Sequence, residues 1–173
     1  VGCKLLYPDR RIQHAGVALG MGLANGQGVA GHFFKYWSDA STDFFKATQI
    51  EVTRNFSAVT AACLLVSKKK YQSVNGLDPV FKISFNDVDF CLKLLNAGNY
   101  NVYTPHAVLY HHESISVGKL NEGTRDIKEF SEEMQLMLRK WGKLIAKDPF
   151  YNINLTRDRE SFEINHHALK RMV

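Results

Sequence analysis

Apolar residues recur at helical spacing in the last third of the chain. Residues 127–145 carry apolar side chains three or four positions apart, with acidic residues early in the segment and basic residues late. This order of charge complements the helix dipole, so we expect an amphipathic helix there. Shorter helices are predicted over residues 87–97, ended by Gly98, and over residues 68–74.

Short apolar runs elsewhere predict strands. Residues 5–7 and 12–17 flank a turn that contains proline and aspartate, which is typical of a hairpin. The run over residues 58–66 is small or apolar at nearly every position, so we expect a strand buried on both faces in mid-sheet. Two more strands are predicted over residues 100–103 and 107–111. Strands interleaved with helices indicate the α/β fold class, in a single domain.

The composition is that of an ordinary globular protein, and the charge narrows the choice of partners only slightly. The 173 residues have a formal net charge of +5, which suits nucleic acid, an acidic membrane face or a phosphorylated small molecule. Nucleic acid is disfavoured, because the lysines and arginines are scattered and no recognisable binding motif accompanies them. The three cysteines lie singly in apolar stretches, so we expect reduced, buried thiols in a cytoplasmic protein.

The sequence FNDVDFCLKLL, residues 85–95, places two carboxylates at the start of a predicted helix. Acidic residues in a first helical turn face backbone N–H groups without partners, so Asn86 can cap the helix while Asp89 pairs with Lys93. Capping does not explain why Asp87 lies on the apolar side of the helix, so a catalytic base is a second interpretation. A metal-binding Asp-x-Asp is disfavoured, because such a pair projects from an open loop beyond a strand and here a helix follows directly.

A second polar cluster, YHHES, follows the last predicted strand. Adjacent histidines on an extended segment point to opposite faces, so at most one of His111 and His112 joins a given metal site. They stand at the end of an apolar strand, where the sites of α/β proteins assemble. A metal ligand and an ordinary histidine therefore both stay open as interpretations.

The order and spacing of these motifs resemble a known family. The sequence NDVDFCLKL is followed by Gly98, then by YTPHA, YHHES and DPFYN. Upstream, KLLYPD precedes IQHAG and NFSAVTAAC. Together they resemble the C-terminal half of the catalytic domain of glycosyltransferase family 2, above all bacterial rhamnosyltransferase-like enzymes that build cell-surface polysaccharide.

The resemblance implies a GT-A fold, with a mixed sheet and flanking helices, that moves a sugar from a nucleotide-diphospho-sugar to an acceptor hydroxyl. It implies inversion at the anomeric carbon, a glycan or lipid-linked acceptor and a divalent cation, Mn²⁺ or Mg²⁺. Asp87 resembles the general base, and Asp89 its supporting or acceptor-contacting partner. His111 resembles the metal ligand, with His112 as the alternative.

The same resemblance places the acceptor beside small residues. Thr60, Ala61 and Ala62 would leave room for sugars next to the base, and Arg54 would add a charge contact to the substrate. An alternative from another enzyme class is a small metal-dependent hydrolase, in which Asp87, Asp89, His111 and His112 hold a metal or activate water.

The chain also departs from the family. Family members carry an N-terminal nucleotide-binding half, ending in a true Asp-x-Asp, before the hairpin with which this chain begins. We therefore expect residues 1–173 to be a fragment of a larger glycosyltransferase, supplying the acceptor side and the base but inactive alone. Apolar surface where the missing half packs predicts self-association. The expected location is cytoplasmic, peripheral at the inner face of the membrane.

Overall fold

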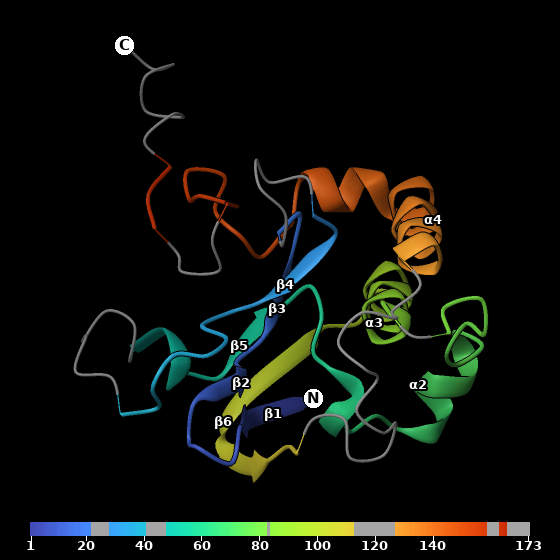
Figure 1. Ribbon diagram of the computed structural model, residues 1–173. Coiled ribbons are helices and arrows are strands. Elements are labelled where there is room, and N and C mark those ends of the chain that lie inside the picture. Colours follow the sequence, from blue (N-terminus) through green and yellow to red (C-terminus); the bar gives the residue numbers. More distant parts are fainter. Residues whose placement is uncertain (22–27, 41–47, 83, 113–126, 159–162, 166–173) are drawn as a thin grey trace.

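The structure is a computed structural model that describes residues 1–21, 28–40, 48–82, 84–112, 127–158 and 163–165. Its centre is a mixed four-stranded sheet in the order β2-β1-β6-β5, with a two-stranded ribbon of β3 and β4 beside it (Figure 1). The strands are β1 (Gly2–Leu6), β2 (Ile12–His14), β3 (Val17–Leu19), β4 (Ala30–His32), β5 (Arg54–Phe56) and β6 (Asn101–Tyr110). This confirms the predicted α/β class with a mixed sheet and flanking helices, and it is compatible with half of a GT-A fold.

The predicted helices are confirmed. They are α2 (Lys68–Ser73), α3 (Asn86–Asn96) and α4 (Ile127–Ala146). Figure 1 shows α4 beside α3 at one side of the sheet, and a hydrogen bond of 2.8 Å from Trp141 of α4 to Asp89 of α3 joins the two helices. None of the described helices is long and apolar enough to cross a bilayer.

A parallel pairing of β1 with β6 holds the centre of the sheet together. The register places Gly2 opposite Tyr103 and Leu6 opposite Tyr110. It shifts between Cys3 and Lys4, whose partners in β6 lie on either side of Pro105. Proline has no N–H to give to a neighbouring strand, so a break in the ladder falls naturally at this position. One continuous β6 therefore replaces the two short strands predicted on either side of the proline.

The predicted buried strand over residues 58–66 is wrong. Its first residues are buried, but the segment makes two isolated bridges instead of a ladder, and the chain turns at η2 (Ala61–Cys63), a 3₁₀ turn. Oγ1 of Thr60 accepts a hydrogen bond of 3.3 Å from the backbone N–H of Ala62 and so caps this turn. Threonine hydroxyls compete with strand ladders for backbone N–H groups, which the apolar pattern does not reveal. Leu65, which we expected to be buried, is 76% exposed.

A buried carboxylate joins three parts of the chain. Asp148, which follows α4 and is 4% exposed, accepts hydrogen bonds from the backbone N–H of Leu19 at 2.7 Å and from Oγ of Ser57 at 2.7 Å. The backbone N–H of Phe150 adds a third, at 2.8 Å. Because a carboxylate removed from water needs donors, Asp148 fixes β3 and the segment before η2 against the end of α4.

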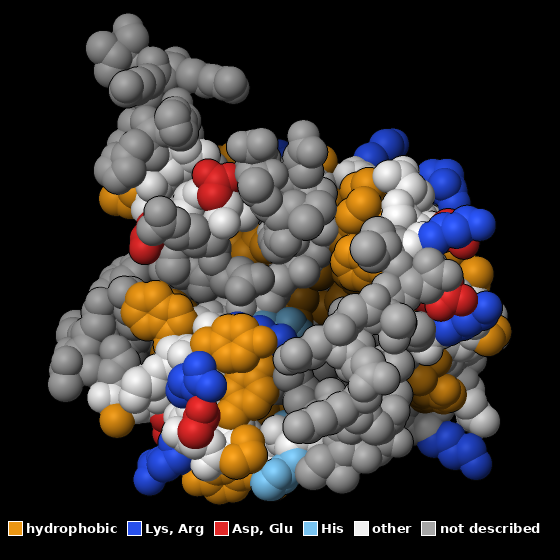
Figure 2. Space-filling model, viewed as in Figure 1, with side chains coloured by type: hydrophobic (Ala, Val, Ile, Leu, Met, Phe, Trp, Pro, Cys, Tyr) orange, Lys and Arg blue, Asp and Glu red, His pale blue; other side chains and the backbone are white. Residues whose placement is uncertain are grey.

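The second half of β6 presents apolar side chains to solvent. Among the described residues, β5 pairs with β6 only as far as Tyr103, so the part that follows has β1 as its one strand partner. Val108, Leu109 and Tyr110 are 44, 49 and 54% exposed, and Figure 2 shows hydrophobic side chains at the surface over this lower part of the sheet. An apolar strand edge of this kind favours association with another surface.

The cysteines are free thiols, as predicted. Cys3 and Cys91 are buried, whereas Cys63 in η2 is half-buried, which corrects the expectation that all three are buried. Burial raises the pKa of Cys91 to about 12, so its thiol stays protonated and unreactive at neutral pH.

Asp148→Asn tests the importance of this buried carboxylate. We expect the free energy of unfolding to fall by about 2 to 4 kcal/mol, because the new amide places donors against donors in a buried site. Urea unfolding followed by circular dichroism measures the change. Asp158→Asn, at an exposed position, is the matched control and should lose less than about 0.5 kcal/mol. Equal stability of the two variants would contradict the role given to Asp148.

Candidate functional site

The candidate site centres on Asp87, in the first turn of α3. Its Oδ2 accepts a hydrogen bond of 3.0 Å from the backbone N–H of Ala61, which lies 26 residues earlier in the chain. Its Oδ1 accepts a hydrogen bond of 2.8 Å from the backbone N–H of Val88. The side chain is half-buried, and Ala61 and Ala62 beside it are exposed. The fold thus brings a fixed, partly accessible carboxylate next to small residues.

The start of α3 differs from the prediction that Asn86 caps the helix. The cap position is Phe85, which has a left-handed φ of 62° and makes no side-chain cap hydrogen bond. Asn86 is the first helical residue, and its Oδ1 accepts from the backbone N–H of Asp87 at 2.7 Å. A left-handed conformation at a bulky residue costs about 1 to 3 kcal/mol. The packing of Phe85 against Phe130, with ring centroids 5.5 Å apart, offsets this cost.

Asp89 points away from Asp87, into the interface between α3 and α4. It is 0% exposed, and its Oδ1 accepts hydrogen bonds of 2.8 Å from Nε1 of Trp141 and from Nζ of Lys140. The predicted pairing with Lys93 is confirmed, with Nζ 3.7 Å from Oδ2. Because the two carboxylates face different elements, the literal Asp-x-Asp does not bring them to one cation. The geometry makes Asp89 a support for α3, and an acceptor contact stays a prediction.

The other predicted substrate contacts are Thr60, Ala61, Ala62 and Arg54. The first three lie in or next to the turn η2, beside Asp87, whereas Arg54 contacts other protein side chains. Thr60 is buried and caps η2, whereas the exposed Ala61 and Ala62 form the surface of the turn next to the carboxylate. Nη1 of Arg54 donates a hydrogen bond of 2.5 Å to Gln49, and its guanidinium lies 4.8 Å from the ring centroid of Phe56. A substrate contact by Arg54 stays a prediction.

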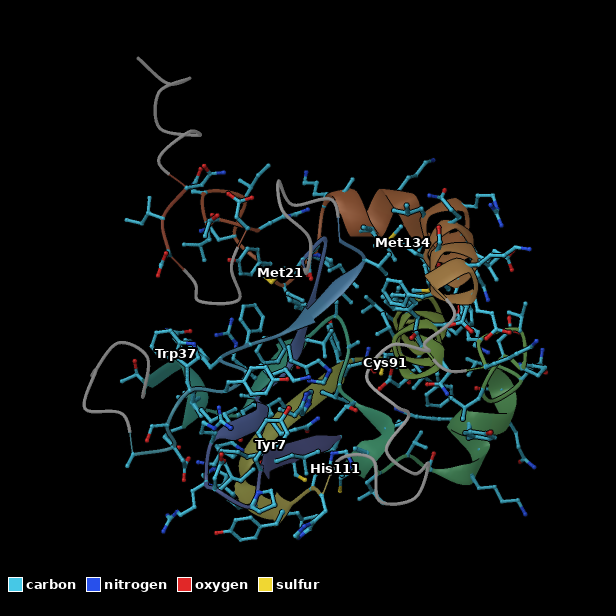
Figure 3. The ribbon with its side chains drawn as sticks, in the orientation of Figure 1. Tyr7, Met21, Trp37, Cys91, His111 and Met134 are labelled. Atoms are coloured by element: carbon cyan, nitrogen blue, oxygen red, sulfur yellow. The ribbon has the colours of Figure 1, made fainter. Side chains whose placement is uncertain are left out.

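His111 lies where the parallel strands β1 and β6 end. Its backbone N–H donates a hydrogen bond of 2.8 Å to the carbonyl of Leu6, and Figure 3 shows it near Tyr7 at the lower edge of the sheet. Nδ1 of His111 is buried and has no hydrogen-bond partner among the described residues. His112 is exposed. Within the described ranges no group of three or more histidine, cysteine and carboxylate side chains is placed to hold a metal, and the metal site stays a prediction.

Sequence reasoning missed a buried histidine behind the turn. His14 of β2 is 0% exposed, and its Nε2 accepts a hydrogen bond of 3.5 Å from the backbone N–H of Thr60. Burial, with a smaller contribution from the charge of His32, holds the pKa of His14 well below its ordinary value. The only signal in the sequence was a histidine within the predicted hairpin strand over residues 12–17, and its partner Thr60 lies 46 residues away.

Comparison with known proteins finds relatives named for O-antigen biosynthesis and rhamnosyl transfer, and one that is uncharacterized. It is 42% identical over 167 residues, 95% of its length, to the uncharacterized protein y4gI of Sinorhizobium fredii. It is 40% identical over 118 residues, 67% of its length, to the O-antigen biosynthesis protein RfbC of Myxococcus xanthus. Over 61 residues, 35% of its length, it is 34% identical to the N-acetylglucosaminyl-diphospho-decaprenol L-rhamnosyltransferase of Mycobacterium tuberculosis.

These similarities concern parts of longer proteins. The chain spans 17, 9 and 20% of the lengths of the three relatives, respectively. No protein-family model matches the sequence, and no solved structure matches it significantly. The chain is therefore similar to a segment of proteins named for O-antigen synthesis and rhamnosyl transfer.

The burial of His14 predicts a pH dependence of stability. The ordinary pKa of histidine is 6.5 and the folded value is lower, so as pH falls the unfolded chain takes up the proton first. The free energy of unfolding should be level above about pH 7 and should fall below about pH 6.5, by up to about 1.4 kcal/mol per pH unit for this proton. Urea unfolding at several pH values measures it. His14→Gln should lose this share of the slope, and the exposed control His106→Gln should keep it. An unchanged slope in His14→Gln would refute the assignment.

Proposed function

We propose that this chain is the acceptor side of an inverting glycosyltransferase of family 2 with a GT-A fold. The observation that carries the proposal is the contact between Asp87 and Ala61, which holds a partly accessible carboxylate beside small exposed residues. Similarity to proteins named for rhamnosyl transfer and O-antigen synthesis supports a sugar as substrate. The donor is a nucleotide-diphospho-sugar, and the acceptor is a hydroxyl of a glycan or lipid-linked glycan in cell-surface polysaccharide synthesis.

Asp87 acts as the general base in this proposal. The acceptor hydroxyl gives its proton to a carboxylate oxygen while its own oxygen bonds to the anomeric carbon, and the bond from that carbon to the nucleoside diphosphate breaks. Each oxygen of Asp87 accepts one backbone hydrogen bond, which fixes the group and leaves lone pairs for the proton. A positioned base of this kind contributes about a hundredfold to ten-thousandfold in rate.

A divalent cation, Mn²⁺ or Mg²⁺, supplies positive charge for the departing diphosphate when it is bound. We propose His111 as one ligand, because its buried Nδ1 lacks a hydrogen-bond partner in the described part of the chain. His112 is the alternative. The other ligands would come from an upstream nucleotide-binding half.

The remaining contacts follow from this arrangement. Ala61 and Ala62 give the acceptor room, Thr60 holds their turn, and Arg54 adds a charge contact to the substrate. A metal-dependent hydrolase is not favoured, because Asp89 is buried between α3 and α4, where it binds Trp141 and Lys140 and does not face the same space as Asp87.

The upstream half, in this proposal, packs on the exposed apolar edge of β6. Without that half, the same edge is where two copies of the chain would associate. A lipid-linked acceptor would place the enzyme in the cytoplasm, at the inner face of the membrane.

Asp87→Asn in the full-length protein tests the base. We expect turnover of sugar transfer to fall at least about a hundredfold, because the amide cannot take the proton. Binding of the nucleotide-sugar, followed by calorimetry, should change less than about twofold, since Asp87 faces the acceptor. The matched control Asp158→Asn, at an exposed position, should keep both properties. Turnover equal to that of the unmodified protein would remove Asp87 as base.

His111→Ala tests the metal ligand. We expect Mn²⁺-dependent binding of the nucleotide-sugar to weaken about tenfold or more, while binding measured without the metal stays the same. Calorimetric titrations with and without Mn²⁺ provide the measurement, and His112→Ala is the paired variant. A loss only in His112→Ala would transfer the role to that residue, and no loss in either would exclude a histidine ligand.

A further inference from the structure

Two histidines meet beside the turn that holds Asp87. Nδ1 of His14 on β2 and Nδ1 of His32 on β4 are 3.1 Å apart, and the rings meet edge to face with centroids 5.0 Å apart. On its other side, His14 accepts the hydrogen bond from the backbone N–H of Thr60. We propose that His14 and His32 are positioning residues, which hold Thr60 and Ala61 where Ala61 fixes the proposed base. This inference rests on the function proposed for Asp87.

The hydrogen bonds admit one arrangement of protons in the neutral pair. The backbone N–H of Thr60 can only donate, so Nε2 of His14 accepts and the proton of His14 lies on Nδ1. That proton points at His32, whose Nδ1 therefore accepts and whose own proton lies on Nε2. An additional proton would set two donors face to face, either at Thr60 or between the two Nδ1 atoms.

The surroundings of His14 also oppose an added proton. Leu5 of β1 lies opposite it in the sheet, and Tyr103 of β6 meets its ring at a centroid distance of 6.3 Å. Thr60 faces Nε2, and His32 is the titratable group of the described residues whose charge acts on it. Burial and the charge of His32 both lower the pKa of His14, so His14 stays neutral at physiological pH.

Two consecutive residues connect the pair to the base. The N–H of Thr60 meets His14, and the N–H of Ala61, the next residue, donates to Oδ2 of Asp87 at 3.0 Å. The hydroxyl of Thr60 also caps η2. Protonation of His14 on Nε2 removes the hydrogen-bond acceptor of the Thr60 N–H. The turn η2 is then no longer held by His14, and the N–H of Ala61 that orients Asp87 can shift with it. A displacement of about 1 Å at a catalytic group can cost about a hundredfold in rate.

Variants of His14 in the full-length protein separate positioning from simple packing. The amide oxygen of glutamine can replace Nε2 as acceptor, whereas leucine has no acceptor. We expect His14→Leu to lower kcat about tenfold to a hundredfold, with the KM of the donor within about twofold of normal. His14→Gln should keep most of the turnover and should lose the fall of kcat that protonation of His14 causes in the unmodified protein, at a pH well below the ordinary pKa of histidine. The exposed control His106→Gln should keep both the rate and that fall.

A measurement of the protons themselves does not depend on turnover. Imidazole ¹⁵N shifts of the full-length protein near pH 7 should place the proton of His14 on Nδ1 and that of His32 on Nε2. If His14→Leu does not fold, His32→Leu, which removes the partner of Nδ1 of His14, should also lower kcat. A proton on Nε2 of His14, or a normal rate and pH profile in the leucine variants, would overturn the proposal. Normal turnover in Asp87→Asn, even with Nδ1–H found on His14, would instead overturn the base and with it the positioning role.

Discussion

Burial of carboxylates is the constraint on which the placement of the candidate site depends. Asp89, Glu133 and Asp148 are 0, 7 and 4% exposed, and each is bonded to donors from a different element. Glu133 of α4 accepts from the backbone N–H groups of Lys82 and Ser84, at 2.8 and 2.9 Å. An unpaired buried charge costs several kcal/mol, so each carboxylate fixes the relative position of the elements that it joins.

The proposed base is held from two sides as a result. Asp89 binds α3 to α4, and Glu133 of α4 binds the segment just before α3. Together these contacts fix the position of the first turn of α3. Asp148 holds Ser57 and thereby the start of the segment that leads to Ala61. The partly exposed hydrogen bond between Ala61 and Asp87 is worth about 1 kcal/mol by itself. This hydrogen bond can form because Asp148 fixes the segment that leads to Ala61, while Asp89 and Glu133 fix the start of α3.

Local signals in the sequence predicted part of this arrangement. The spacing of apolar residues and the charge order of α4 depend on the helix alone, and Gly98, with a φ of 78°, ends α3 where expected. The hairpin of β1 and β2 followed from its turn residues, and Asp9 accepts from the backbone N–H of Arg11 at 3.0 Å as such turns do. The helix start at Asp87 was likewise visible in the sequence.

What the sequence did not reveal depends on partners far along the chain. Residues 58–66 look like a strand because nearly every position is small or apolar, but the cap at Thr60 and the contact with His14 make a turn instead. The sequence predicted the pairing of Asp89 with Lys93, but it did not reveal that Asp89 is buried against Lys140 and Trp141, the latter 52 residues farther along the chain. Side chains that face different elements cannot be told apart by spacing alone.

The most direct test of the account is a crystal structure of the full-length protein with its acceptor bound. We predict that the reacting hydroxyl lies within about 3.2 Å of a carboxylate oxygen of Asp87, next to Ala61 and Ala62. An acceptor bound elsewhere, or a hydroxyl that faces another carboxylate while Asp87 stays without contact, would contradict the account.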